Sequence, residues 1–341
     1  MPIPPLDARA MQQAAARQAR LTKPAGSLGR LEELSVRLAG MTGRLNPRLG
    51  DAVVFTFAAD HGVAAEGVSA YPREVTPQMV LNFLRGGAAI NVIAREVGAR
   101  VVVADVGVDA DLPPHAGLRD VKVRRGTDSI TRGSAMTEAE AQKAIDTGRS
   151  LVDGENPDIA LTGDMGIGNT TTSAAVVCAL TGLNPTLIVG RGTGVDDAGL
   201  QRKLAAVTRA LEVNRESLTR GPIAVLAAVG GLEIAGLVGV ILQAAEMRRP
   251  VIIDGFISGA AALAASAIDP AVGGYMIASH RSQELGHGAV LERLGLRPLL
   301  DLDLRLGEGT GAALALPLVR ASVRLLNDMA TFDEAGVSER S

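Results

Sequence analysis

The stretch DIALTGDMGIGNTTT, residues 158–172, joins a short aliphatic run to a turn with three glycines and a run of threonines. The aliphatic run over 158–162 predicts a buried strand, and the residues from Asn169 onward predict a helix. Glycines let the backbone approach a ligand closely, and the free N–H groups at a helix start attract phosphate. The stretch therefore predicts a strand–turn–helix unit with a candidate anion site at its turn.

The same alternation of strands and helices extends along the chain on both sides of this unit. Aliphatic runs predict further strands, and apolar spacing and capping residues predict further helices. The predicted strands are 52–58, 100–105, 251–254 and 275–278, and the predicted helices are 6–20, 28–42, 137–153, 196–217 and 310–327. Thr76 and Pro77 predict another helix start, with Thr76 as the N-cap. The pattern indicates a parallel, doubly wound α/β sheet whose ligand lies outside the carboxyl ends of the strands.

Composition agrees with this fold and excludes several classes of function. Hydrophobic residues make up 47% of the 341 residues, aromatic residues only 2%, and there are 40 glycines. The core must therefore be aliphatic, as in buried parallel strands. The net charge is −3 and no run of like charge stands out, so we expect no nucleic-acid partner. With a single cysteine and four histidines at no metal-binding spacing, we expect neither a disulfide nor a metal site.

The location of the protein is predicted from two segments. The N-terminal MPIPPLDARA lacks the basic and apolar regions of a signal peptide. Residues 221–245 are nearly all apolar, but Glu233 and the Gly230-Gly231 pair interrupt them. Two buried helices meeting at the glycines explain this segment better than a membrane span does. We expect a cytoplasmic protein with no membrane partner.

Two more glycine-rich turns lie ahead of predicted helices. GRGTGVDD at 190–197 precedes Lys203 by about two helical turns, and GEGTG at 307–311 carries Glu308 between two glycines. Lys203 is interpreted as either a solvated surface lysine or a phosphate contact. Glu308 is either a charge favoured by the helix dipole or a carboxylate base facing a pocket. Asn169 stands where a P-loop needs lysine, and no GxGxxG motif occurs here, so an ATPase, kinase or dehydrogenase is disfavoured.

These motifs together resemble those of the nicotinate-nucleotide–dimethylbenzimidazole phosphoribosyltransferase family of cobalamin synthesis. The resemblance covers nearly the whole chain in the same order. It is carried by TKPAGSLG at 22–29, ADHGV at 59–63, EVT at 74–76, QMV at 78–80, GDMGIGNTT at 163–171, GRGTG at 190–194, DGF at 254–256, SH at 279–280 and GEGTG at 307–311.

The resemblance implies an architecture and a reaction. It implies a Rossmann-like parallel sheet flanked by helices in a large domain over 46–300, and a small helical domain formed by 1–45 and 301–341. It implies a homodimer with no cofactor and no metal. It also implies transfer of phosphoribose from nicotinate mononucleotide to 5,6-dimethylbenzimidazole, giving alpha-ribazole 5'-phosphate and nicotinate. A non-catalytic nucleotide-binding protein, or a phosphoribosyltransferase for another base, remains the alternative.

The resemblance also assigns site residues. Glu308 matches the catalytic carboxylate, Gln78 matches a residue of the benzimidazole pocket, and Ser282 lies in a loop of further nucleotide contacts. The nucleotide and phosphate contacts correspond to Asp164, Gly166, Ile167, Gly168, Asn169, Thr170, Gly192, Thr193 and Lys203. Asp164 departs from the family pattern, in which a glutamate contacts the ligand. Aspartate keeps the charge, but it is one methylene shorter and reaches less far.

Overall fold

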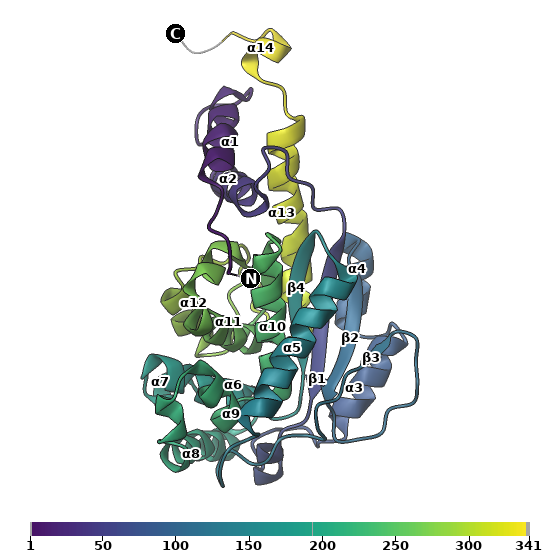
Figure 1. Ribbon diagram of the computed structural model, residues 1–341, viewed down its shortest axis with the longest axis vertical. Helices are drawn as coiled ribbons and strands as arrows, with labels where there is room; N and C mark the ends of the chain where they lie inside the picture. The colour runs from purple at the N-terminus through teal and green to yellow at the C-terminus, as the bar shows by residue number, and fades with distance from the viewer. Residues whose placement is uncertain (1, 193, 339–341) are drawn as a thin grey trace.

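The computed structural model describes residues 2–192 and 194–338, and its centre is one sheet of six parallel strands (Figure 1). The strands stand in the order β3-β2-β1-β4-β5-β6. They are β1 (Ala52–Ala59), β2 (Arg100–Gly107), β3 (Leu118–Asp120), β4 (Ile159–Met165), β5 (Val251–Ile253) and β6 (Met276–Ala278). This is the Rossmann order, so the predicted fold class is confirmed. Its topological switch point lies between β1 and β4, where ligands bind in such sheets.

The central strands are aliphatic because both of their faces are covered. Every residue of β1 is buried, and so are all residues of β4 except Met165. A parallel strand between two helical layers has no solvent face, which explains an apolar run instead of an alternating pattern. β1 and β4 pair from Ala52 with Ile159 to Ala58 with Met165. Their carboxyl ends therefore finish side by side.

Helices cover both faces of the sheet. On one face α10 (Leu232–Glu246) and α11 (Phe256–Ile268) pack against the strands, and α5 (Glu138–Glu155) lies outside α10. The opposite face carries α3 (Val75–Leu84), α4 (Ala89–Val97) and α13 (Thr310–Asp328). The remaining helices are α1 (Ala8–Arg20), α2 (Arg30–Thr42), α6 (Asn169–Thr181), α7 (Pro185–Ile188), α8 (Asp197–Val213), α9 (Pro222–Val229), α12 (His287–Leu294) and α14 (Phe332–Ala335).

The apolar segment 221–245 forms two buried helices, as predicted. α9 ends at Val229 and α10 begins at Leu232, with the Gly230-Gly231 pair between them. Across residues 2–192 and 194–338, none of the helices combines the length and the apolar character that a membrane span needs.

Helices from the two terminal regions of the chain pack together beyond one end of the sheet (Figure 1). α1 and α2 pack against the distal part of α13, and the Arg17 guanidinium donates to the Leu326 carbonyl over 2.8 Å. A small core of Ala10, Ala14, Ala39 and Leu326 lies between these helices. The first turn of α13, in contrast, lies at the carboxyl edge of the sheet. The division into domains at residues 45 and 300 stays a prediction.

The prediction for Thr76 was wrong. α3 begins at Val75 with Glu74 as its N-cap, so Thr76 lies inside the first turn and is buried. Its hydroxyl accepts a hydrogen bond from the Ile167 N–H over 3.1 Å instead of capping its own helix. The threonine therefore fixes the glycine turn after β4, a long-range role that a local capping pattern does not reveal.

Candidate active site

A cavity of about 460 Å³ opens at the carboxyl ends of β4, β5 and β6. Seven of the predicted site residues line it: Asp164, Gly166, Ile167, Asn169, Thr170, Gly192 and Ser282. The wall also contains side chains that the sequence did not single out as site residues, among them Tyr71, Phe256, His280, Glu284 and Arg305. Phe256 and His280 belong to motifs that carried the family resemblance, whereas Tyr71 and Arg305 stand in irregular segments without such a signal.

The turn after β4 is tightly packed against β1. A Cβ atom on Gly166 would lie 2.4 Å from the carbonyl oxygen of Ala59, so only glycine fits there. Gly168 has φ +98° and is the N-cap of α6, a conformation that favours glycine. The Asn169 side chain donates to Asp164 Oδ2 over 3.0 Å. The turn therefore presents Asp164 and the start of α6 to the cavity in a fixed arrangement.

Glu308 occupies an unusual backbone turn directly before α13. Gly307, Glu308 and Gly309 have φ values of +88°, +63° and +97°. Left-handed conformation is costly for glutamate, and such strain is characteristic of functional sites. The Glu308 N–H donates to the Asp164 carbonyl over 3.2 Å, and the Ile90 N–H donates to Glu308 Oε2 over 3.2 Å. Burial raises the pKa of Glu308, which brings this carboxylate closer to the range of a general base.

Asp254 holds the start of α13 in place. Its carboxylate accepts hydrogen bonds from the Gly309 N–H over 3.1 Å and the Ala312 N–H over 2.9 Å. Burial raises the pKa of Asp254 to about 7, although these backbone N–H groups act in the opposite direction. The residue thus fixes the turn that carries Glu308.

Four acidic side chains at this edge of the sheet are each at most 5% exposed, and we call them the acidic cluster: Asp164, Glu233, Asp254 and Glu308. Burial and the negative charges of Asp254, Glu233 and Glu308 raise the pKa of Asp164 well above its usual range. Among the described residues, Asp164 Oδ1 has no hydrogen-bond partner. The same described residues contain no group of three or more His, Cys, Asp or Glu arranged to hold a metal ion. Asp164 therefore brings an unsatisfied carboxylate oxygen to the cavity wall.

A buried histidine compensates one member of the acidic cluster. His61 Nε2 lies 2.8 Å from Glu233 Oε1, and His61 Nδ1 lies 3.3 Å from the Thr172 hydroxyl. Burial opposes the charged imidazole, but the Glu233 carboxylate outweighs burial and raises the pKa of His61. The histidine of the ADHGV motif thus joins β1 to α10 and to the first turn of α6 behind the cavity.

Lys203 is a buried residue and not a surface lysine. It is 1% exposed, and its ammonium group donates to the Thr170 hydroxyl over 2.8 Å. Burial lowers the pKa of Lys203 to about 8, with the Glu284 carboxylate acting in the opposite direction. Gly192 lies against this contact, because a Cβ there would come within 2.6 Å of Lys203 Nζ. The glycine turns after β4 and before α8 therefore meet around one ammonium group.

The other predicted residues are placed as follows. Ser282 is buried, and its N–H donates to His287 Nδ1 over 2.9 Å. Gln78 is exposed on α3 and lies outside the cavity lining described above. Thr193 falls outside the described residues. The structure thus brings the turns after β4 and β6 and those before α8 and α13 to one edge, while the role of Gln78 stays a prediction.

Comparisons with known proteins match this chain over nearly its whole length. A family profile described as Phosphoribosyltransferase covers residues 3–337. The nicotinate-nucleotide–dimethylbenzimidazole phosphoribosyltransferase of Chloroflexus aggregans is 58% identical over 341 residues, which span 99% of this chain and 96% of that protein. The enzyme of the same name from Geobacter sp. strain M21 is 52% identical over 98% of this chain and 97% of its own length.

A solved structure agrees with the fold in detail. The crystal structure of the nicotinate-nucleotide–dimethylbenzimidazole phosphoribosyltransferase from Thermus thermophilus superposes with a TM-score of 0.93 at 51% identity. The match covers 98% of this chain and 100% of the solved chain. Sequence and fold therefore agree in pointing to one group of relatives.

Proposed function

The chain belongs to the nicotinate-nucleotide–dimethylbenzimidazole phosphoribosyltransferase family, and on that premise we propose how its residues carry out the reaction. The enzyme transfers phosphoribose from nicotinate mononucleotide to 5,6-dimethylbenzimidazole and releases nicotinate and alpha-ribazole 5'-phosphate. The step supplies the nucleotide loop of cobalamin. The observation that carries the assignment of roles is the buried Glu308 carboxylate, held by a strained turn whose backbone is bonded to Asp164.

Glu308 is the general base of the transfer. One ring nitrogen of the benzimidazole attacks the ribose C1 carbon while nicotinate leaves, and the other ring nitrogen must lose its proton. Glu308 accepts that proton, and its raised pKa matches it to a weakly acidic N–H better than an ordinary glutamate would be. Gln78, on α3, orients the base.

Asp164 stabilises the sugar during the transfer. The transition state at C1 has oxocarbenium character and carries positive charge. A carboxylate in a water-poor site stabilises such charge strongly, provided that it is ionised when the substrate is bound. The cationic sugar and the positive leaving pyridinium favour the ionised form of Asp164, against the neighbouring carboxylates that raise its pKa.

The phosphate is held away from the reacting carbon. The start of α6 offers the backbone N–H group of Thr170, and Lys203 adds a positive charge next to the Thr170 hydroxyl. Gly166, Ile167, Gly168, Gly192, Thr193 and Ser282 complete the nucleotide side. Binding energy from this remote group serves to align C1 with the incoming nitrogen.

Three further features belong to the proposal. We assign a homodimer, a cytoplasmic location and the absence of a nucleic-acid partner from the family resemblance and the charge pattern, and each has a direct measurement. Light scattering of the purified protein gives the oligomeric state. Fractionation of the source cells gives the location, and a gel-shift titration tests binding to nucleic acid.

The reaction itself is tested by following both products. Purified protein is incubated with nicotinate mononucleotide and dimethylbenzimidazole in the presence of a chelator, and the products are separated by chromatography. We expect nicotinate and a ribosylated benzimidazole phosphate in equal amounts. Binding of the nucleotide without release of nicotinate would contradict catalysis. If nicotinate were released only with another base, that base, and not dimethylbenzimidazole, would be the acceptor.

A further inference from the structure

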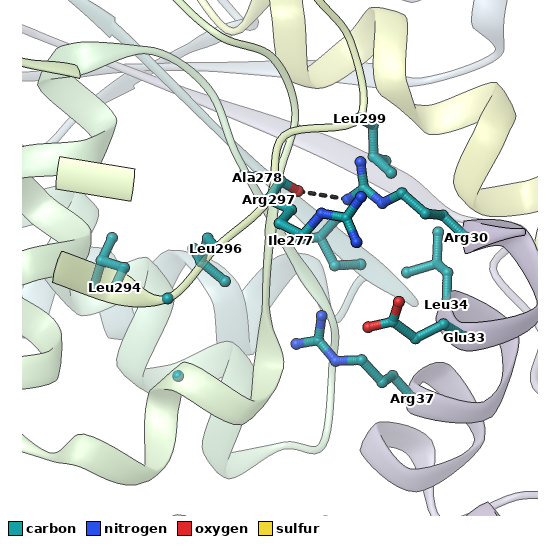
Figure 2. Close-up of a pocket in the computed structure, with 12 residues that line it drawn as sticks. Arg30, Glu33, Leu34, Arg37, Ile277, Ala278, Leu294, Leu296, Arg297 and Leu299 are labelled. Carbon is teal, nitrogen blue, oxygen red and sulfur yellow. Dashed lines mark hydrogen bonds between the residues drawn. The ribbon is translucent and has the colours of Figure 1, made fainter. Parts of the chain in front are cut away.

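A second polar pocket, separate from the cavity described above, lies between α2 and the segment that follows α12 (Figure 2). Its volume is about 250 Å³. Three arginines and one glutamate line it, together with backbone from the end of β6: Arg30, Glu33, Arg37 and Arg297 with Ala278. Three positive charges and one negative charge leave a net charge of +2. We call this site the arginine pocket.

The arginines from α2 are held in place by backbone carbonyl groups. Arg30 donates to the carbonyl of Arg297 over 2.6 Å and also to that of Pro298. Arg37 donates to the carbonyl of Met276 over 3.2 Å. A guanidinium group carries five N–H donors, so these bonds orient the groups and leave further donors facing the pocket. Figure 2 shows Arg30 and Arg297 close together, with Arg37 facing the same space.

The positive charges of the pocket are poorly compensated within the described residues. None of the ion pairs in the described part of the chain involves Arg30, Arg37 or Arg297. Burial and the charge of Arg297 lower the pKa of Arg30, with Glu33 opposing them. Burial likewise lowers the pKa of Arg37. An anion in the pocket would reduce the repulsion between the arginines and would replace the contacts with water that burial removes.

We propose that the arginine pocket binds a phosphoryl dianion, either inorganic phosphate or the phosphate of a small phosphomonoester. Two negative charges match the net charge of +2, and planar guanidinium groups match phosphate oxygens by paired hydrogen bonds. A pocket of about 250 Å³ is smaller than the usual site for a drug-sized ligand, which limits the occupant to a small molecule.

The bound anion would join two parts of the chain. Arg30 and Arg37 belong to α2, whereas Arg297 belongs to the segment after α12. In that segment the Leu299 N–H donates to the Ala278 carbonyl over 3.1 Å, and the Leu300 N–H donates to the Ser279 carbonyl over 2.9 Å. Phosphate in the pocket therefore clamps α2 against the end of β6, so binding should raise the thermal stability of the whole chain.

The first test measures thermal unfolding in a variant whose catalytic phosphate site is already weakened. In Lys203→Gln protein, inorganic phosphate should raise Tm by about 2–4 °C over potassium chloride of equal ionic strength. Adding Arg297→Gln should abolish this rise, because Arg297 contributes a charge to the pocket and its side chain makes none of the hydrogen bonds that anchor α2. Adding Arg293→Gln, an exposed arginine on the last turn of α12, should leave the rise intact.

The second test locates the ion and keeps the proposal open to refutation if a variant fails to fold. Crystals of the unmodified protein soaked in selenate, a tetrahedral dianion, should show an anomalous peak between Arg30, Arg37 and Arg297. An equal rise of Tm in the Arg297→Gln protein, or a peak at the turn after β4 and none in the arginine pocket, would overturn the proposal.

The source of the phosphoryl group is decided by comparing ligands in the same thermal assay. Ribose 5-phosphate acting at lower concentration than inorganic phosphate would identify a phosphomonoester as the occupant. Equal or stronger action of inorganic phosphate would identify the free ion. No response of the Lys203→Gln protein to either compound would overturn the proposal in the same way as the missing anomalous peak.

Discussion

The acidic cluster at the edge of the sheet and the arginine pocket beside α2 each carry an excess of one charge, and the repulsion within each is relieved in a different way. The carboxylates are almost fully buried, and burial and mutual repulsion raise the pKa of Asp164 while burial raises that of Asp254. The arginines are partly exposed and do not release a proton at any ordinary pH. Repulsion is therefore relieved by protons in the first region and by counter-ions in the second.

This difference separates a site for chemistry from a site for binding. A carboxylate with a raised pKa can take a proton during a reaction and return it to solvent, as a general base must. A guanidinium group keeps its charge and contributes orientation and attraction only. Each of the following experiments changes one charge and asks whether its region behaves in the predicted way.

The largest effect is expected from Glu308→Gln. Glutamine keeps the size of the side chain but cannot accept the benzimidazole proton, so turnover should fall by about 10²- to 10⁴-fold. Affinity for nicotinate mononucleotide should change much less, because the phosphate site is separate. In the wild-type enzyme, turnover should also fall as the pH drops and Glu308 becomes protonated. Steady-state rates and a nucleotide-binding titration measure both effects.

The matched control is Glu96→Gln, which removes an exposed glutamate from α4. It should leave the rate unchanged, because Glu96 is exposed and is not among the residues that line the cavity. Near-normal turnover of the Glu308→Gln enzyme would remove Glu308 from the mechanism. It would then be a structural residue that fixes the turn before α13.

The next largest effect is expected from Lys203→Gln, which removes the buried cation at the phosphate site. A hydrogen bond to a charged group contributes roughly 1.5–3 kcal/mol, so KM for nicotinate mononucleotide should rise about 10- to 100-fold. The wild-type KM should rise above pH 8, since burial sets the pKa of Lys203 at about 8 and the neutral amine attracts phosphate weakly. The variant should show no rise of KM above pH 8. An identical rise in the variant would mean that a group other than Lys203 causes it.

Much of the acidic site could be predicted from the sequence, since its residues stand in local patterns. Asp164 lies at the end of β4 and Asp254 directly follows β5, whereas Glu308 and Asn169 stand where a glycine turn meets a helix. Parallel topology alone brings the ends of β4 and β5 to one edge. What the pattern could not supply was the tertiary contact: Thr76 resembles a local cap, yet its hydroxyl binds the backbone of Ile167.

The arginine pocket could not be predicted in the same way. Arg30, Glu33 and Arg37 stand on one face of α2 at a spacing that is ordinary for a solvated helix. Their neighbour Arg297 lies more than 250 residues away in an irregular segment, and no signal links the two. The lack of any charged run in the sequence was therefore a poor guide to charge in the folded chain.

A smaller effect, on stability, is expected from Asp164→Asn. An aspartate whose pKa is raised by folding holds its proton more tightly in the folded chain. The free energy of unfolding therefore falls as pH rises above the ordinary carboxyl range, near pH 4, toward the raised pKa. Asparagine does not ionise, so the variant should gain about 1–3 kcal/mol over the wild type between pH 5 and pH 8. Urea unfolding at the two pH values measures the difference.

The control for this change is Asp120→Asn, which removes an exposed carboxylate at the end of β3 and should not reproduce the gain. Constant relative stability of Asp164→Asn from pH 5 to pH 8 would show that Asp164 is ionised at no extra cost. In that case the acidic cluster would not reduce its repulsion by binding protons, and this difference from the arginine pocket would be lost. A gain in stability accompanied by a loss of turnover would show that the unsatisfied carboxylate is retained for catalysis.

The smallest effect is expected from Arg297→Gln in chloride buffer without phosphate. Removing one of three like charges should raise the free energy of unfolding by roughly 0.2–1 kcal/mol, since Arg297 is exposed and solvent screens its repulsion with Arg30. Arginine keeps its proton throughout, so the gain should be the same at pH 5 and pH 8. With phosphate present the sign should reverse, because only the wild-type pocket then gains a ligand. A gain that changes with pH would mean that a titrating group, and not a permanent cation, governs this region, and the contrast between the two charged regions would fail.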